Sequence, residues 1–190
     1  MLRRVTLAAR WTAAISAAVV LALSGCGARS LGEVFPTNPT GETITFHARV
    51  GQTVNIELPT PVPLHTSVRL ISASMTFLPP GTRLERIVAY RYVDTGGGAG
   101  VWIGDLPEMY PHRFKPSPVT AVTMNPGRIS DWYLEGIFTW TRPVAVVRIP
   151  PIHLTYVDAR GRRGSQDIPT PLVGTIHPRR AIQPAEPDGA

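Results

Sequence analysis

Cysteine is nearly absent from this 190-residue chain, which contains only Cys26. A single cysteine cannot form a disulfide within the chain, so the fold must be stabilised by its buried apolar core. Amphipathic helical segments are also missing after the first 25 residues, whereas 20 prolines are present. Prolines in β proteins are typical of strand edges and connections, so this composition favours an all-β domain.

Lysine is almost absent as well, since Lys115 is the only lysine among 19 basic residues. We interpret the excess of arginine as a coding bias. The formal net charge is +6, but Arg3, Arg4 and Arg10 supply three of these charges, which leaves about +3 for the rest of the chain. This charge is spread thinly along the sequence, whereas nucleic-acid binding needs a clustered basic patch. We therefore expect no nucleic-acid partner.

Common catalytic signatures are missing too. The sequence contains no G-x-S-x-G, H-E-x-x-H, Walker A or calcium-loop pattern. The glycine-rich stretch 96–100 does not match the dinucleotide-binding pattern and leads into an expected strand, so it is interpreted as a hairpin loop. We expect a protein that is not an enzyme and that uses no cofactor.

An alternative is an envelope metal carrier or hydrolase whose site is built from sequence-distant residues. Met109, His112 and Met124 offer thioether and imidazole groups, which suit Cu(I). Asp105 and Glu108 offer carboxylates, although nothing in the sequence places two of them at a hydrolytic separation. The histidines are widely separated: His47, His65, His112, His153 and His177.

The first 26 residues follow the pattern of an export signal. Three arginines within the first ten residues precede an apolar stretch over residues 11–23 and the small residues Ser24 and Gly25. The apolar stretch is shorter than the roughly 20 residues that a membrane-spanning helix needs. The tetrad Leu23-Ser24-Gly25-Cys26 resembles the lipobox of bacterial lipoproteins.

This resemblance implies that residues 1–25 are a signal peptide that is removed. It also implies that the Cys26 thiol receives a diacylglycerol, with fatty acids such as palmitate, and becomes the first residue. The protein would then be anchored to the extracytoplasmic face of the cell membrane. No thiol would remain for a cysteine nucleophile, a thiolate metal site or a blue-copper centre. The pair Arg3-Arg4 leaves open whether export is general or twin-arginine.

Composition divides the rest of the chain into three parts. Residues 26–41 are small, polar and proline-containing, which predicts a flexible tether behind the lipidated Cys26. Residues 42–177 are expected to form one β domain. Residues 178–190 contain three prolines and few apolar side chains, which predicts a disordered tail.

Short β-prone segments separated by turn residues fill residues 42–177. Their number and spacing predict an immunoglobulin-like antiparallel β-sandwich. The first two segments, 44–50 and 54–58, alternate apolar and polar residues around Gly51 and are expected to pair as a hairpin. The remaining expected strands are 68–78, 84–93, 101–103, 119–124, 133–140, 144–149, 152–157 and, more weakly, 165–168.

The stretch 101–114 is the candidate recognition surface for an envelope protein partner. Loops on a β scaffold often bind partners, and interface cores are enriched in aromatic residues, Met and Arg. Its candidate binding residues are Trp102, Met109, Tyr110, His112 and Arg113. The alternative is that its aromatic residues cover one open end of the sandwich. A second aromatic set has a spacing that favours core packing: Trp132, Tyr133 and Trp140.

Overall fold

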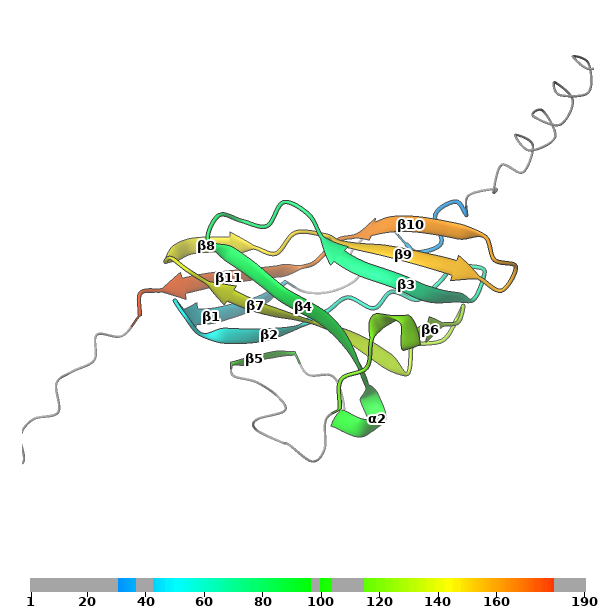
Figure 1. The fold of residues 1–190 in the computed structure, drawn as a ribbon, viewed down its shortest axis with the longest axis horizontal. Helices are drawn as coiled ribbons and strands as arrows, with labels where there is room; N and C mark the ends of the chain where they lie inside the picture. The colour runs from blue at the N-terminus through cyan, green and yellow to red at the C-terminus, as the bar shows by residue number, and fades with distance from the viewer. Residues whose placement is uncertain (1–30, 37–42, 97–99, 104–114, 180–190) are drawn as a thin grey trace, which may run out of the picture. The chain divides into compact units, whose positions relative to one another are not determined.

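The computed structural model describes residues 31–36, 43–96, 100–103 and 115–179, which are almost entirely β-structure (Figure 1). The elements are β1 (Ile44–Arg49), β2 (Thr53–Leu58), β3 (Val68–Met75), β4 (Thr82–Arg91), α2 (Tyr92–Thr95), β5 (Val101–Ile103), η1 (Val119–Ala121), β6 (Thr123–Met124), β7 (Trp132–Trp140), β8 (Val144–Arg148), β9 (Ile152–Asp158), β10 (Arg163–Ile168) and β11 (Leu172–His177).

The strands form three sheets around one apolar core. Their orders are β4-β7-β2-β5, β10-β9-β3-β6 and β1-β11-β8. All pairs are antiparallel except β1 with β11. In β9, alternate residues from Ile152 to Asp158 are buried, which is the period expected of a strand with one face on a core. The all-β sandwich prediction is therefore confirmed, while the immunoglobulin-like detail stays a prediction.

Two proline-containing bends divide one long hairpin between the sheet β1-β11-β8 and the sheet β10-β9-β3-β6. β8 continues into β9 through Pro150 and Pro151, and β10 continues into β11 through residues 169–171. Proline has no N–H to donate to a ladder, so strand pairing is interrupted there. The Thr170 hydroxyl spans the gap, because its Oγ1 lies 2.6 Å from the carbonyl oxygen of Ile149 and 2.9 Å from that of Pro150.

The prediction that residues 44–58 form a hairpin is wrong, because the two strands do not pair with each other. β1 pairs with β11, whereas β2 pairs with β7 and β5 in another sheet. The chain changes sheet at Gly51, whose φ of 80° suits glycine. The N–H of Val50 donates to His177 and that of Gly51 donates to Trp140, so the two sheets hold this turn between them. Alternation identifies a strand and its buried face, but it does not identify the partner strand.

Other differences concern segment ends. Residues 119–124, expected as a strand, form a 3₁₀ turn followed by the two-residue strand β6. The expected strand 84–93 ends earlier, because Tyr92 begins the short helix α2. β11 was not expected at all, since Gly174 interrupts its apolar alternation and prolines flank it.

The prediction that residues 26–41 form a tether is wrong for residues 31–36. Val34 and Phe35 are buried, and Phe35 has no exposed surface. The side chain of Gln166 on β10 accepts hydrogen bonds from the N–H groups of Val34 (3.1 Å) and Phe35 (3.0 Å), and its Nε2 donates to the Phe35 carbonyl (2.7 Å). The folded unit therefore begins at Leu31. Within the described part of the chain, no helix is long and apolar enough to span a bilayer.

Candidate functional site

The predicted recognition stretch is only partly described. Trp102 lies in β5, where its backbone pairs with Asn55 at the edge of the sheet. Its side chain lies outside what the structure describes, as do Met109, Tyr110, His112 and Arg113. Their role in binding a partner stays a prediction.

A cluster of tyrosines and glutamates covers the same sheet near β5. Glu57 of β2 is directly opposite Glu135 of β7, and Tyr90 of β4 is opposite Tyr133 of β7. The rings of Tyr90 and Tyr133 stack with centroids 5.6 Å apart, and the ring of Tyr92 lies 5.1 Å from that of Tyr133. Glu135 and Tyr133 are fully buried. This arrangement gathers polar groups in a largely water-excluded layer.

Glu57 connects this layer to the chain segment that follows β4. Its carboxylate accepts a hydrogen bond from the Tyr92 hydroxyl (3.1 Å) and another from the Gly100 N–H (2.9 Å). The backbone N–H of Glu57 also donates to the Gly100 carbonyl at 2.7 Å. Because both carboxylate oxygens hold protein groups, Glu57 has a structural role and anchors α2 and the start of β5 to β2.

Two tyrosines of this cluster, Tyr92 and Tyr133, are expected to lower the stability of the folded protein at alkaline pH. Burial and the neighbouring Glu57 raise the pKa of Tyr92 from 10 to about 12, and burial also raises the pKa of Tyr133. The unfolded chain releases these protons above pH 10 while the folded protein retains them. We therefore expect the free energy of unfolding to fall as the pH rises from about 10 to about 12.

Urea denaturation at pH 9, 10 and 11 measures this dependence. Tyr92→Phe removes one of the shifted groups, so its stability should decline less steeply above pH 10 than that of the wild type. An unfolding free energy that stays constant from pH 9 to pH 11 in the wild type would contradict the expectation.

The second aromatic set lies where its spacing indicated. Tyr133 and Trp140 are buried, and Trp132 is partly buried against the core. The guanidinium of Arg91 lies 5.9 Å from the ring centroid of Trp132, within cation–π range. This set is therefore part of the fold.

Two cavities occupy the end of the sandwich at the β9–β10 turn. One, of about 420 Å³, lies between residues 31–34, the segment His65–Thr66 and the turn. The other, of about 360 Å³, lies between that turn and the first residues of β3. Asp158 and Ala159 line both. Glu33, Arg160 and Arg162 line the larger cavity, so its walls carry both signs of charge.

Asp158 organises the β9–β10 turn. Its carboxylate accepts hydrogen bonds from the backbone N–H groups of Arg160 (2.9 Å) and Arg162 (2.8 Å), and from the Arg162 guanidinium (2.8 Å). Burial by itself raises the pKa of Asp158, but these hydrogen bonds and the charge of Arg162 bring it below its usual value. Asp158 is therefore ionised at neutral pH, and its charge is matched by Arg162.

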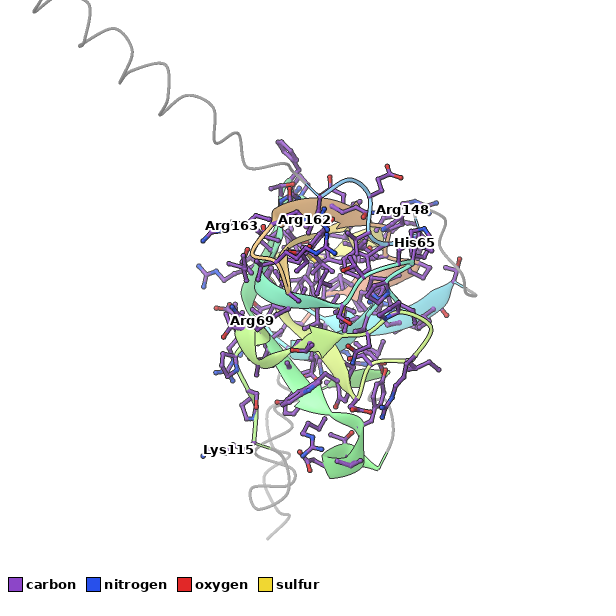
Figure 2. The ribbon with its side chains drawn as sticks, turned by 90° about the vertical axis from the view of Figure 1, so that its right-hand side faces the viewer. His65, Arg69, Lys115, Arg148, Arg162 and Arg163 are labelled. Carbon is purple, nitrogen blue, oxygen red and sulfur yellow. The ribbon has the colours of Figure 1, made fainter. Side chains whose placement is uncertain are left out.

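Arginines surround this turn on the solvent side. Arg163 on β10 and Arg69 on β3 are both directly opposite Val157 on β9, so the three residues form one row across the sheet. Residues paired in this way point to the same face, and two strand spacings place the two arginine Cα atoms about 10 Å apart. Figure 2 places Arg69 and Arg163 on one side of the sandwich and His65 on the other. The row is not evident from the sequence, since Arg69 and Arg163 lie far apart in the chain, but the run Arg160-Gly161-Arg162-Arg163 does indicate a concentration of positive charge.

Three of the described histidines make pairwise side-chain contacts. His47 and His177 lie on neighbouring strands with ring nitrogens 3.5 Å apart, and His153 Nδ1 lies 2.7 Å from Asp167. Among the residues that the structure describes, no three His, Cys, Asp or Glu side chains are grouped to hold a metal ion. Met124, a candidate copper ligand, is buried within the apolar core.

Comparisons of the chain with protein-family models, with curated proteins and with solved structures found no match.

Proposed function

We propose that this protein is a lipid-anchored, non-enzymatic binding module on the extracytoplasmic face of the cell membrane. The lipobox-like tetrad ending at Cys26 supports the anchor. Two or more acyl chains on one cysteine provide stable attachment, since each buried CH₂ contributes about 0.8 kcal/mol. The β-sandwich would be the part that acts outside the membrane.

The observation that carries this proposal is the position of the first folded residues. Leu31 donates its N–H to Arg163 at 3.1 Å, so the folded unit begins five residues after Cys26. A fully extended chain covers about 3.6 Å per residue, so Leu31 can lie at most about 18 Å from Cys26. A lipid on Cys26 would therefore hold one end of the sandwich close to the bilayer.

The partner surface that we propose is the stretch 101–114, whose first three residues form β5 at the edge of its sheet. Ile103, within this stretch, is 50% exposed, and Val93 of α2 is 70% exposed. Exposed apolar side chains suit a protein partner. Trp102, Tyr110 and Arg113 of this stretch are of the residue types that dominate binding energy at interfaces.

Substitution of Cys26 tests the anchor. Cys26→Ala removes the only thiol, so metabolic labelling with a clickable fatty acid should mark the wild type and leave the variant unlabelled. Cell fractionation should find the wild type with membranes at high salt. Cys26→Ser is the matched control, since it preserves the size and polarity of the side chain but has no sulfur to form the thioether with the lipid. It should therefore remain unlabelled, like the alanine variant. Equal labelling of wild type and variants would contradict the proposal.

A further inference from the structure

We propose that Arg69, Arg160 and Arg163 form a surface that binds the anionic phospholipid headgroups of the membrane to which the protein is anchored. This inference rests on the proposed function, because the anchor brings the surface to the bilayer. Arg69 and Arg163 flank Val157 in one row of the sheet, and Arg160 lies in the adjoining β9–β10 turn. All three arginines are exposed.

The position of this surface is the first argument. The described chain begins at the same end, since the backbone of Leu31 bonds to that of Arg163. Figure 1 shows the β9–β10 turn at this end, whereas β11 ends at the opposite one. A lipid on Cys26 would therefore orient the arginine-bearing end toward the bilayer, within a link of about 18 Å at full extension. Electrostatic attraction to headgroups acts over a Debye length of about 8 Å at physiological salt, so the surface must approach the membrane closely.

Positive charge exceeds negative charge among the described residues around the β9–β10 turn. Asp158 is matched by Arg162, which binds its carboxylate at 2.8 Å. Within the described residues, the side chains of Arg69, Arg160 and Arg163 make no hydrogen bond or ion pair. Among the residues that line the two cavities, Glu33 is the other acidic one, and it lines the larger cavity with Arg160. A net positive charge therefore remains on the outer row.

The chemistry of the arginine groups is a further argument. The guanidinium is planar and weakly hydrated, and it binds phosphate oxygens through two parallel N–H groups. Three guanidinium groups on a strand row and an adjoining turn suit a surface of many phosphates better than a single enclosed anion. The larger cavity is a poorer anion site, because Glu33 and Asp158 line it.

The test uses a chain that starts at Gly27 and therefore carries no lipid. All described buried apolar residues lie between Val34 and Ile176, so this chain keeps its whole core. It is sedimented with vesicles of phosphatidylcholine containing 30% phosphatidylglycerol, and with pure phosphatidylcholine vesicles. We expect binding to the anionic vesicles alone, with loss of binding at 0.5 M salt. No preference for the anionic vesicles would overturn the inference, whereas the Cys26 labelling result would still decide the anchor separately.

A triple variant, Arg69→Gln, Arg160→Gln and Arg163→Gln, locates the binding. Each arginine near an anionic membrane contributes about five-fold to the partition coefficient, so the variant should bind about 100-fold more weakly. The matched control changes three other exposed arginines by the same chemistry: Arg86→Gln, Arg148→Gln and Arg179→Gln. Equal weakening by both triple variants would overturn the proposed surface. Thermal melts should coincide for all three proteins.

A competition experiment distinguishes a surface that binds many membrane headgroups from a site that binds one small phosphate. Glycerol phosphate is added at 10 mM and compared with sodium chloride of equal ionic strength. Equal release of the protein from the anionic vesicles by the two solutes supports a surface that binds many headgroups. Selective release by glycerol phosphate would identify a site for one phosphate and would overturn the membrane surface.

Discussion

Phe35→Ala is expected to lower the free energy of unfolding by about 4 kcal/mol. Phe35 has no exposed surface, and its ring packs edge-on against Tyr156 with centroids 5.2 Å apart. Truncation of a buried phenylalanine typically costs about 3–5 kcal/mol through lost burial and a residual cavity. The melting temperature should fall by about 10 °C, since about 2–4 °C accompany each kcal/mol in a domain of this size.

Phe77→Ala is the matched control for Phe35→Ala. It removes the same atoms from a side chain that is 96% exposed, so its stability should change by less than about 0.5 kcal/mol. Urea denaturation of both variants with the wild type gives the comparison. If Phe35→Ala were as stable as Phe77→Ala, residues 31–36 would belong to the tether after all.

Gln166→Ala is expected to destabilise the domain by about 3–5 kcal/mol. The substitution leaves three backbone groups unpaired in a buried place: the N–H of Val34 and the N–H and carbonyl of Phe35. Each unpaired buried group costs about 1–3 kcal/mol, and local rearrangement toward water recovers part of that cost. Val34 and Phe35 should separate from β10 in a fraction of molecules, which limited proteolysis detects as new cleavage after Leu31.

Gln166→Glu separates the acceptor role of this side chain from its donor role. The glutamate keeps an oxygen for the two N–H groups but places a charge beside the Phe35 carbonyl, where Nε2 donates in the wild type. We expect a loss smaller than that of Gln166→Ala at low pH, where a protonated carboxyl can donate. The double variant Phe35→Ala with Gln166→Ala should lose less than the sum of its parts, because both substitutions release one segment. Strictly additive losses would contradict the shared role.

Residues 31–36 connect the proposed lipid anchor at Cys26 to the strand that carries part of the proposed membrane surface. Phe35 and Gln166 hold residues 31–36 to β10, and β10 begins with Arg163. A link that is rigid from Leu31 onward would fix which end of the sandwich meets the bilayer. If residues 31–36 were detached from β10, a lipid on Cys26 would leave the domain free to rotate relative to the bilayer. The arginines would then contact the headgroups for only part of the time.

Much of the local structure was predictable from residue order. Alternation over 152–157 predicted β9 and its buried face, because period 2 places one face of a strand on the core. The β-prone segment 133–140 predicted β7 with a small error at its start, although β7 is buried along nearly its whole length. The burial of Tyr133 and Trp140 agrees with the core packing predicted for this aromatic set. The lack of amphipathic helical segments predicted the all-β class. The recognition residues of the stretch 101–114 were chosen by composition alone, and that choice is still untested.

Long-range pairing was not predictable from the sequence. β1 pairs with β11 across about 130 residues, and Gln166 satisfies the backbone of Phe35 at a separation of 131 residues. The sequence suggested a tether over 26–41, because a polar and proline-rich composition does not reveal a buried partner far along the chain.

The sequence by itself determined most of the strand segments, the lack of an internal disulfide, and the lipobox-like tetrad at Cys26, because each depends on neighbouring residues or on a count. Only the tertiary structure decided that Arg69 and Arg163 flank Val157, and that residues 31–36 complete the core. The physical reason is that residue patterns report local backbone preference and the side to be buried. The choice among possible strand partners depends on packing and hydrogen bonding summed over the whole domain.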